Sequence, residues 1–168
     1  MHGPRRSLFA GAHVVAAALI VLALITDACA PTPVSHGCDG PARDHVMLVD
    51  RLRCAGLRVD IAEPVTLPLL RAQGTTLVLT GVPLSGEARV ESFSYDDTDL
   101  ASDARVIVRE DAAKFAPDGS LREPGASISY HGTPHLFRSD RVIAIYAGDD
   151  RAVLDLLTGL LGPQFAGR

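Results

Sequence analysis

The fold is decided by residues 127–150, SISYHGTPHLFRSDRVIAIYAGDD, and by the leucine-rich stretch that follows them. Residues 127–131 and 135–138 are short extended runs, and residues 141–146 form a longer β-branched and apolar run, a composition typical of strands. The polar pair Ser139-Asp140 separates the last two runs as a turn. We therefore predict three antiparallel strands, which together with the next helix supply most of the strong apolar surface beyond the first 30 residues.

The leucine-rich stretch predicts the last helix of the chain. Its apolar residues recur at helical spacing and form one broad face: Val153, Leu154, Leu156, Leu157, Leu160 and Leu161. Gly148-Asp149 is expected to cap this helix, and Gly162-Pro163 is expected to end it. The helix should pack this face against the strands.

Upstream of this core, the chain predicts a first helix and three more strands. The helical pattern starts at Pro41 and stops at Gly56, with Val46, Leu48, Val49, Leu52 and Ala55 on its apolar side. Strands are expected at 57–61, 75–80 and 88–95. The breaker-rich residues 81–86 would join the last two strands as a hairpin.

A second helix is expected after the acidic run Asp96-Asp97-Thr98-Asp99, whose carboxylates would cap its free N–H groups. Its apolar face would consist of Leu100, Ala104, Ile107, Val108, Ala112 and Phe115. Strand pairs with short turns and separate helices predict an α+β fold, a two-layer domain over 41–168 with an antiparallel sheet and helices packed on one face.

The domain is preceded by a hydrophobic signal or anchor helix over residues 1–28. Arg5 and Arg6 precede an apolar run at 8–25, and small residues follow at 28–30, which are the three parts of an export signal. The cationic start favours the cytoplasmic side, so the rest of the chain is expected to be extracytoplasmic.

Three outcomes of this leader are open. A small residue before Cys29, just past the apolar run, favours lipidation of Cys29, although Thr26 and Asp27 fit the lipobox pattern poorly. Residues 8–26 could instead remain as an uncleaved span of a ~30 Å hydrocarbon layer. Cleavage after the small triplet would give plain secretion. We favour a lipid anchor in the cell membrane, with secretion as the alternative.

The three cysteines bear on this choice because an odd number leaves one without a partner. Acylation of Cys29 would leave Cys38 and Cys54, whose disulfide would close a loop of about 15 residues and contribute roughly 3 kcal/mol. Cys38 lies before the predicted first helix and Cys54 lies near its end, so the linker would have to double back, and both redox states stay open. Residues 29–40, rich in proline and glycine, are expected to be a linker.

Several segments together resemble a family of small, uncharacterised bacterial lipoproteins. They are FSY (93–95), APDGS (116–120), TPHLFR (133–138), RVIAIYAGDD (141–150) and LGPQFAG (161–167). The resemblance covers about residue 43 to the end, and its carboxy-terminal block is the most specific part. It implies a lipobox cysteine, a short linker and this compact domain, but it brings no catalytic or ligand residues. A longer second helix and the additional Cys54 distinguish this chain.

Composition excludes some partners. The net charge is −4 without a basic block, so we expect no nucleic-acid partner. No G-x-S-x-G elbow or phosphate loop occurs, and the acidic run at 96–99 lacks the glycine-turned loop of a calcium site. We therefore assign no catalytic residue and no cofactor.

Two weaker constellations stand out near the carboxy terminus. His131 and His135, four apart around a proline junction, could share zinc or copper with a carboxylate, but no third ligand is visible and partly exposed histidines are favoured. Arg138 and Arg141 flank the predicted turn and could bind an anion or a headgroup, although a solvated hairpin tip is the simpler interpretation.

These observations favour an extracytoplasmic lipoprotein whose domain is a non-enzymatic binding or interaction module at the cell envelope. Its expected partners are the membrane, through the anchor, and an envelope protein or small ligand. The alternative is a small secreted or membrane-anchored hydrolase or metal-binding protein that uses His131 and His135.

Overall fold

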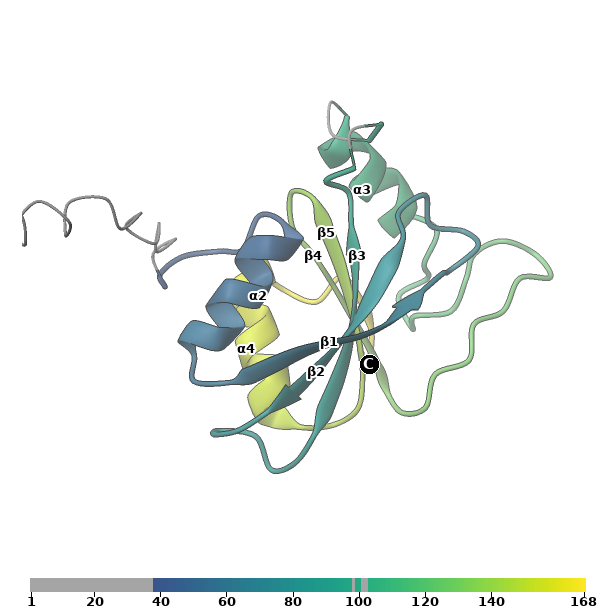
Figure 1. The fold of residues 1–168 in the computed structure, drawn as a ribbon. Coiled ribbons are helices and arrows are strands. Elements are labelled where there is room, and N and C mark those ends of the chain that lie inside the picture. Colours follow the sequence, from purple (N-terminus) through teal and green to yellow (C-terminus); the bar gives the residue numbers. More distant parts are fainter. Residues whose placement is uncertain (1–37, 98, 101–102) are drawn as a thin grey trace, which may run out of the picture. The chain divides into compact units, whose positions relative to one another are not determined.

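The computed structural model describes residues 38–97, 99–100 and 103–168, which belong to one compact unit, His36–Arg168 (Figure 1). Their elements in chain order are α2 (His45–Cys54), β1 (Arg58–Val65), β2 (Gly74–Thr80), β3 (Ala88–Ser94), α3 (Ala104–Ala112), β4 (Pro134–Arg138), β5 (Val142–Ala147), α4 (Arg151–Leu161) and β6 (Ala166–Gly167). The expected leader, Cys29 and most of the linker lie outside the described residues. Within the described part, no helix has the length and apolar character needed to cross a membrane.

The domain is α+β, as predicted, and its sheet is antiparallel throughout. Six strands lie in the order β1-β2-β3-β5-β4-β6. β3 pairs with β5, where Val90 lies opposite Tyr146 and Phe93 lies opposite Ile143. The carboxy-terminal hairpin of β4 and β5 therefore completes the sheet and places β5 near its centre.

The helices cover both faces of the sheet, so the predicted packing on one face is wrong. On one face, α2 and α4 share a core with the alternate strand residues Val90 and Tyr146. On the other face, α3 packs against Phe93 and Ile143. The reason lies in β5, whose residues 142–146 are all buried, because a strand that is apolar on both sides requires cover on both.

Two strand predictions differ from the structure. Residues 127–131 form no strand but run as an irregular segment. The free edge of β4 is taken instead by β6, where Leu136 pairs with Ala166, so no edge of β4 is left for residues 127–131. β1 is also longer than predicted, because a register shift between Ile61 and Pro64 lets pairing with β2 continue past the proline.

The predicted helix starts also need correction. α2 begins at His45, where Asp44 accepts a hydrogen bond from the Met47 amide at 2.8 Å, rather than at Pro41. The acidic run does not cap α3, since Asp96 accepts a hydrogen bond from the Ser94 hydroxyl at 2.9 Å and α3 begins at Ala104.

The last helix starts one residue later than predicted and ends as predicted. Asp150, rather than Asp149, caps α4 by accepting a hydrogen bond from the Ala152 amide at 2.8 Å. Gly162 ends α4 with a φ of 91°, a conformation that glycine adopts readily.

A disulfide joins Cys38 to Cys54, with the two Cα atoms 5.6 Å apart. The side chain of Arg51 also donates a hydrogen bond to the Gly40 carbonyl. Residues 38–40, the last part of the expected linker, are therefore attached to α2.

Candidate functional site: an arginine-lined groove

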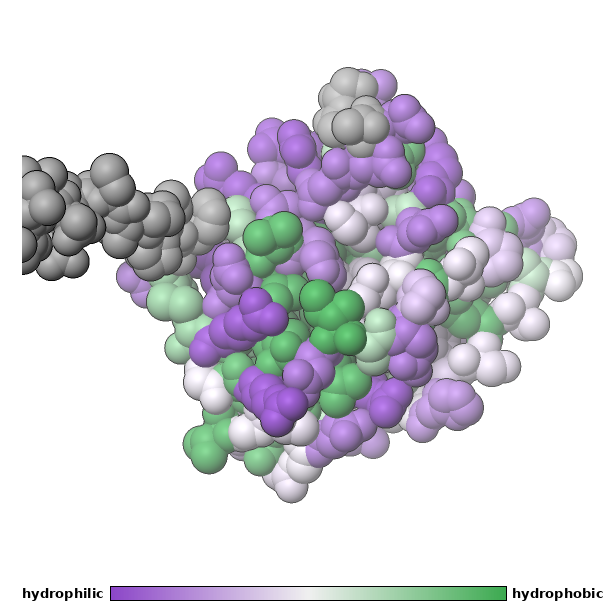
Figure 2. Space-filling view, viewed as in Figure 1, coloured by the Kyte–Doolittle hydropathy of each residue, from purple (hydrophilic) through white to green (hydrophobic). Residues whose placement is uncertain are grey.

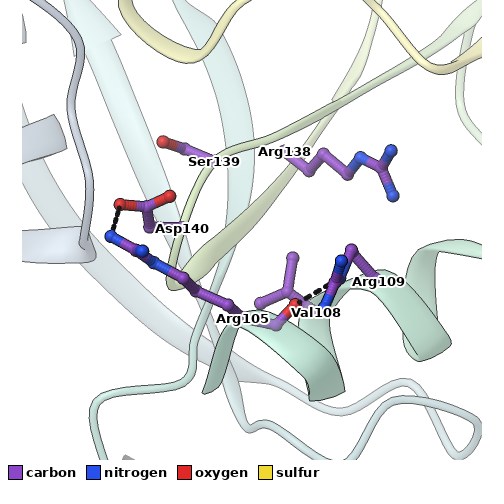
Figure 3. Close-up of a pocket in the computed structure, with 6 residues that line it drawn as sticks. All are labelled: Arg105, Val108, Arg109, Arg138, Ser139 and Asp140. Carbon is purple, nitrogen blue, oxygen red and sulfur yellow. Dashed lines mark hydrogen bonds and ion pairs between the residues drawn. The ribbon is translucent and has the colours of Figure 1, made fainter. Parts of the chain in front are cut away.

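An open groove of about 500 Å³ lies between α3 and the turn that joins β4 to β5. Its lining consists of Arg105, Val108, Arg109, Arg138, Ser139 and Asp140 (Figure 3). A volume of this size is typical of sites for small ligands. The groove is notable because three guanidinium groups line it in a chain with a net charge of −4.

Helical spacing places two of these arginines. Arg105 and Arg109 are four residues apart on α3, so they lie on the same side of the helix. Val108, next to Arg109, is 2% exposed and packs into the core between α3 and the sheet. The third arginine, Arg138, is the last residue of β4 and is exposed.

The groove holds more positive than negative charge. Arg105 forms an ion pair with Asp140, with 2.7 Å between guanidinium nitrogen and carboxylate oxygen. Arg109 donates from Nε to the Arg105 carbonyl at 3.3 Å, and the Arg138 guanidinium lies 5.4 Å from the ring centre of Phe165. Within the described part of the chain, neither Arg109 nor Arg138 has a carboxylate partner.

This arrangement suits recognition of an oxyanion. Guanidinium groups donate several N–H bonds in a planar fork that matches phosphate and carboxylate oxygens. The lining contains no histidine or cysteine that could act as a base or nucleophile, and its one hydroxyl is that of Ser139. The geometry therefore supports binding of an anion.

The sequence indicated only part of this site. Arg138 lies in the groove as an anion ligand would require, whereas Arg141 pairs with Asp96 at 3.6 Å. Arg105 and Arg109 were not singled out. Their i, i+4 spacing on an expected helix was the available signal, but nothing in the sequence showed that this helix meets the β4–β5 turn.

A buried polar cluster anchors α3, and with it the groove. The Asp111 carboxylate is fully buried and accepts hydrogen bonds from the Tyr95 hydroxyl at 2.8 Å and the Lys114 ammonium at 2.8 Å. The Arg71 backbone amide donates at 2.9 Å and the Arg71 Nε at 3.2 Å. These contacts tie α3 to the end of β3 and to the segment before β2.

The cluster also shifts the pKa values of its members. Burial alone would raise the pKa of Asp111, but the hydrogen bonds from Lys114, Arg71 and Tyr95 outweigh it and lower that pKa. Burial, and then the hydrogen bond to Asp111, raises the pKa of Tyr95. Asp111 is therefore ionised and Tyr95 neutral at pH 7.

The two predicted histidines do not share a site. His135 is buried on the face that α4 covers, and its Nδ1 lies 2.8 Å from Gln164 Oε1. Its ring stacks on that of Tyr146, with 6.2 Å between the ring centres. His131 is exposed and lies near Glu91 on the opposite face. The hypothesis of a metal shared between them is wrong. Within 38–97, 99–100 and 103–168, no group of three His, Cys, Asp or Glu side chains is arranged to hold a metal ion.

Hydrophobic residues gather on the surface over α2 and β1 in Figure 2. Exposed side chains of these elements include Val46, at 59% exposure, and Ile61, at 61%. Nothing in the structure shows what would cover them, so this surface supports no specific partner.

Comparison of the chain with protein-family models, with curated proteins and with solved structures finds no match.

Proposed function

We propose that this protein is a non-enzymatic, extracytoplasmic binding domain that recognises an anionic group in the arginine-lined groove. The observation that carries this proposal is that Arg109 and Arg138 line the same groove and that neither has a carboxylate partner among the described residues. Two unpaired guanidiniums supply charge and directed donors for a phosphate or carboxylate group.

The location is part of the same proposal. The export signal over residues 1–28, the lipobox-like position of Cys29 and the family resemblance support a domain that a lipid holds at the outer side of the cell membrane. Its ligand would then be an anionic component of the envelope or a small anion outside the cell. The anchor itself would supply the contact with the membrane.

A hydrolase or metal protein based on His131 and His135 has no support in the geometry. The two side chains lie on opposite faces of the sheet, and Nδ1 of the buried His135 is engaged by Gln164 while its ring stacks on Tyr146. Neither histidine lines the arginine-lined groove.

Anion binding can be tested on the full chain in micelles of an uncharged detergent. We expect inorganic pyrophosphate to shift the backbone amide resonances of α3 and of the β4–β5 turn. The double variant Arg109→Gln/Arg138→Gln should weaken this binding by about tenfold or more, because each charged hydrogen bond contributes roughly 1.5–3 kcal/mol.

A matched control removes the same charge elsewhere. Arg53 and Arg151 are exposed arginines outside the groove, each paired within its own helix, with Asp50 at 3.9 Å and Asp155 at 3.1 Å. Arg53→Gln/Arg151→Gln should change the affinity for pyrophosphate less than twofold, because salt screens charges that lie far from the groove. Equal weakening by both double variants would show that only net charge matters and would contradict the proposal.

The source of the anion can be distinguished in the same system. A soluble phosphate ligand predicts shifts with pyrophosphate alone. A lipid headgroup predicts shifts of the same amides when phosphatidylglycerol is added to the micelle, and little response to pyrophosphate.

A further inference from the structure

A second groove, of about 410 Å³, lies on the sheet face opposite α2 and α4, away from the arginine-lined groove. Strands β1, β2, β3 and β5 form its floor, and the irregular segment at 127–131 forms one wall. Its lining consists of Glu63, Val65, Leu67, Thr76, Arg89, Glu91, Ile128, Ser129, Tyr130, His131, Ile145 and Ala147. It is more enclosed than the arginine-lined groove.

A carboxylate lies in the middle of this floor. Glu91 belongs to β3, and its cross-strand neighbours are Thr76 on β2 and Ile145 on β5, which are 6% and 2% exposed. Glu91 itself is half-buried. No hydrogen bond or ion pair with another described residue engages its carboxylate. Burying an ionised group without a partner is costly, so such a carboxylate in a groove points to a missing cation.

The neighbouring cations do not fill this role. Arg89, on the same side of β3, is paired with Glu87 at 3.1 Å and with Glu63 at 3.5 Å. His131 is exposed at the rim. The Tyr130 hydroxyl donates to the Gly119 carbonyl at 2.9 Å and is thereby engaged.

The electrostatics agree with this geometry. Burial raises the pKa of Glu91, and the nearby His131 only partly opposes this shift. Burial, followed by the carboxylates of Glu91 and Asp118, raises the pKa of Tyr130 to about 12, so its hydroxyl stays neutral. A positive charge bound next to Glu91 would therefore stabilise the ionised carboxylate.

The rest of the lining is apolar enough to hold a short hydrocarbon body. Its apolar members are Val65, Leu67, Ile128, Ile145 and Ala147. Thr76 and Ser129 add hydroxyl groups. A metal ion would need several oxygen or nitrogen ligands, which the lining does not gather around Glu91.

We propose that this groove binds a small organic cation, an ammonium group on a short apolar body, with Glu91 as its counter-ion. The ammonium would sit against the carboxylate on the sheet floor, and the apolar body would lie against the side chains from β1, β5 and the 127–131 segment. This site is separate from the proposed anion site and does not depend on it.

The test uses the full chain in uncharged detergent micelles and three four-carbon probes that differ in charge: n-butylammonium, n-butanol and butyrate. We expect n-butylammonium to shift the amide resonances of Thr76, Glu91 and Ile145 in a saturable manner. Butanol should bind at least about tenfold more weakly, and butyrate should leave these resonances unchanged, because the counter-ion selects the charge.

The variant Glu91→Gln keeps the shape of the side chain and should weaken n-butylammonium binding by about tenfold or more. Glu123→Gln, on an exposed loop outside the groove, is the matched control and should leave it unchanged. Ser129→Lys, at an exposed position of the wall, adds a competing cation without altering the core and should also weaken binding.

Three results would overturn the proposal. They are equal affinity for n-butylammonium in Glu91→Gln and the parent, equal affinity for butanol and n-butylammonium, and no response of the floor amides at saturating probe. The Arg109→Gln/Arg138→Gln variant should retain ammonium binding, so failure of the anion site and failure of this site are distinguishable.

Discussion

The Tyr95 hydroxyl donates a hydrogen bond to Asp111 over 2.8 Å, and both side chains are fully buried although they are 16 residues apart. This bond joins the end of β3 to the last turns of α3. Replacing Asp111 with Ala would leave the Tyr95 hydroxyl and the Arg71 amide without their acceptor and would remove the carboxylate that pairs with Lys114. We expect Asp111→Ala to lower the free energy of unfolding by about 3–5 kcal/mol, measured by urea denaturation.

Tyr95→Phe removes only one of the donors to Asp111, so it should lower the free energy of unfolding by about 1–2 kcal/mol. Glu110→Gln is the control, because Glu110 is the exposed neighbour and pairs with Arg71 at 2.7 Å on the surface; its effect should stay within about 1 kcal/mol. Equal losses in Asp111→Ala and Glu110→Gln would contradict a special role of the buried cluster. They would also remove the explanation for how α3 holds Arg105 and Arg109 in the groove.

The same cluster predicts a loss of stability in acid. The folded-state pKa of Asp111 lies below its unfolded value of about 3.9, so its contribution is present above that value and is lost as the pH falls through the lower folded pKa. The difference in unfolding free energy between the parent and Asp111→Asn should therefore be larger at pH 7 than near pH 2. A difference that is independent of pH would rule out this linkage.

A second pH effect is expected from His45. Its Nδ1 lies 2.9 Å from the buried Ser92 hydroxyl, and burial lowers its pKa despite the opposing carboxylates of Asp96 and Asp44. Below about pH 6.5, His45 binds a proton in the unfolded chain but not yet in the folded chain. The free energy of unfolding should therefore decrease as the pH is lowered, until the pH reaches the lower pKa of folded His45. In His45→Gln the part of the pH dependence that comes from His45 should be absent. Thermal unfolding of the parent and the variant between pH 7 and pH 5 would measure this difference.

The Cys38–Cys54 bond closes a loop with a sequence separation of 16 residues. In the chain-entropy model, the double variant Cys38→Ser/Cys54→Ser should lower the free energy of unfolding by about 3 kcal/mol. Addition of a reductant should have a similar effect on the parent and none on the variant. A parent that is insensitive to reductant and contains two titratable thiols in this pair would contradict the disulfide.

Lipidation predicts that a clickable palmitate analogue labels the protein in bacterial cells and that the label depends on Cys29. Cys29→Ser should abolish the label and release the domain from the membrane fraction if no uncleaved anchor remains. Cys38→Ser/Cys54→Ser serves as the control and should keep the label. Retention of the label in Cys29→Ser would refute lipidation at this residue.

Much of the secondary structure followed from local patterns. The apolar faces of α3 and α4, the β2–β3 hairpin and the β4–β5 hairpin were predicted, because each depends on residues near one another in the chain. The predicted face of α2 is only partly right, since Leu48, Val49 and Leu52 are buried whereas Val46 is 59% exposed and Ala55 is exposed at the end of the helix. The predictions failed where distant residues compete. β6 takes the edge of β4 that the 127–131 segment was expected to occupy, and Asp96 contacts Ser94 and Arg141 instead of capping α3.

The candidate sites were the least predictable part. Arg138 was noted because it lies beside a predicted turn, but its partners Arg105 and Arg109 come from a helix about 30 residues away in the chain, and no local rule links them. Glu91 was not singled out, because it is one polar residue within a predicted strand. It lies in a groove because the irregular 127–131 segment runs along that face of the sheet.

Local patterns along the chain were enough to predict the α+β class, the apolar faces of α3 and α4 and the turns between neighbouring strands, since periodicity and turn chemistry act over a few residues. Packing between distant elements decided that helices cover both faces of the sheet, that His131 and His135 are separated, and that Arg109 and Arg138 line the same groove. Those outcomes depend on which elements pack together, and packing is selected by burial summed over the whole domain rather than by any one stretch of the chain.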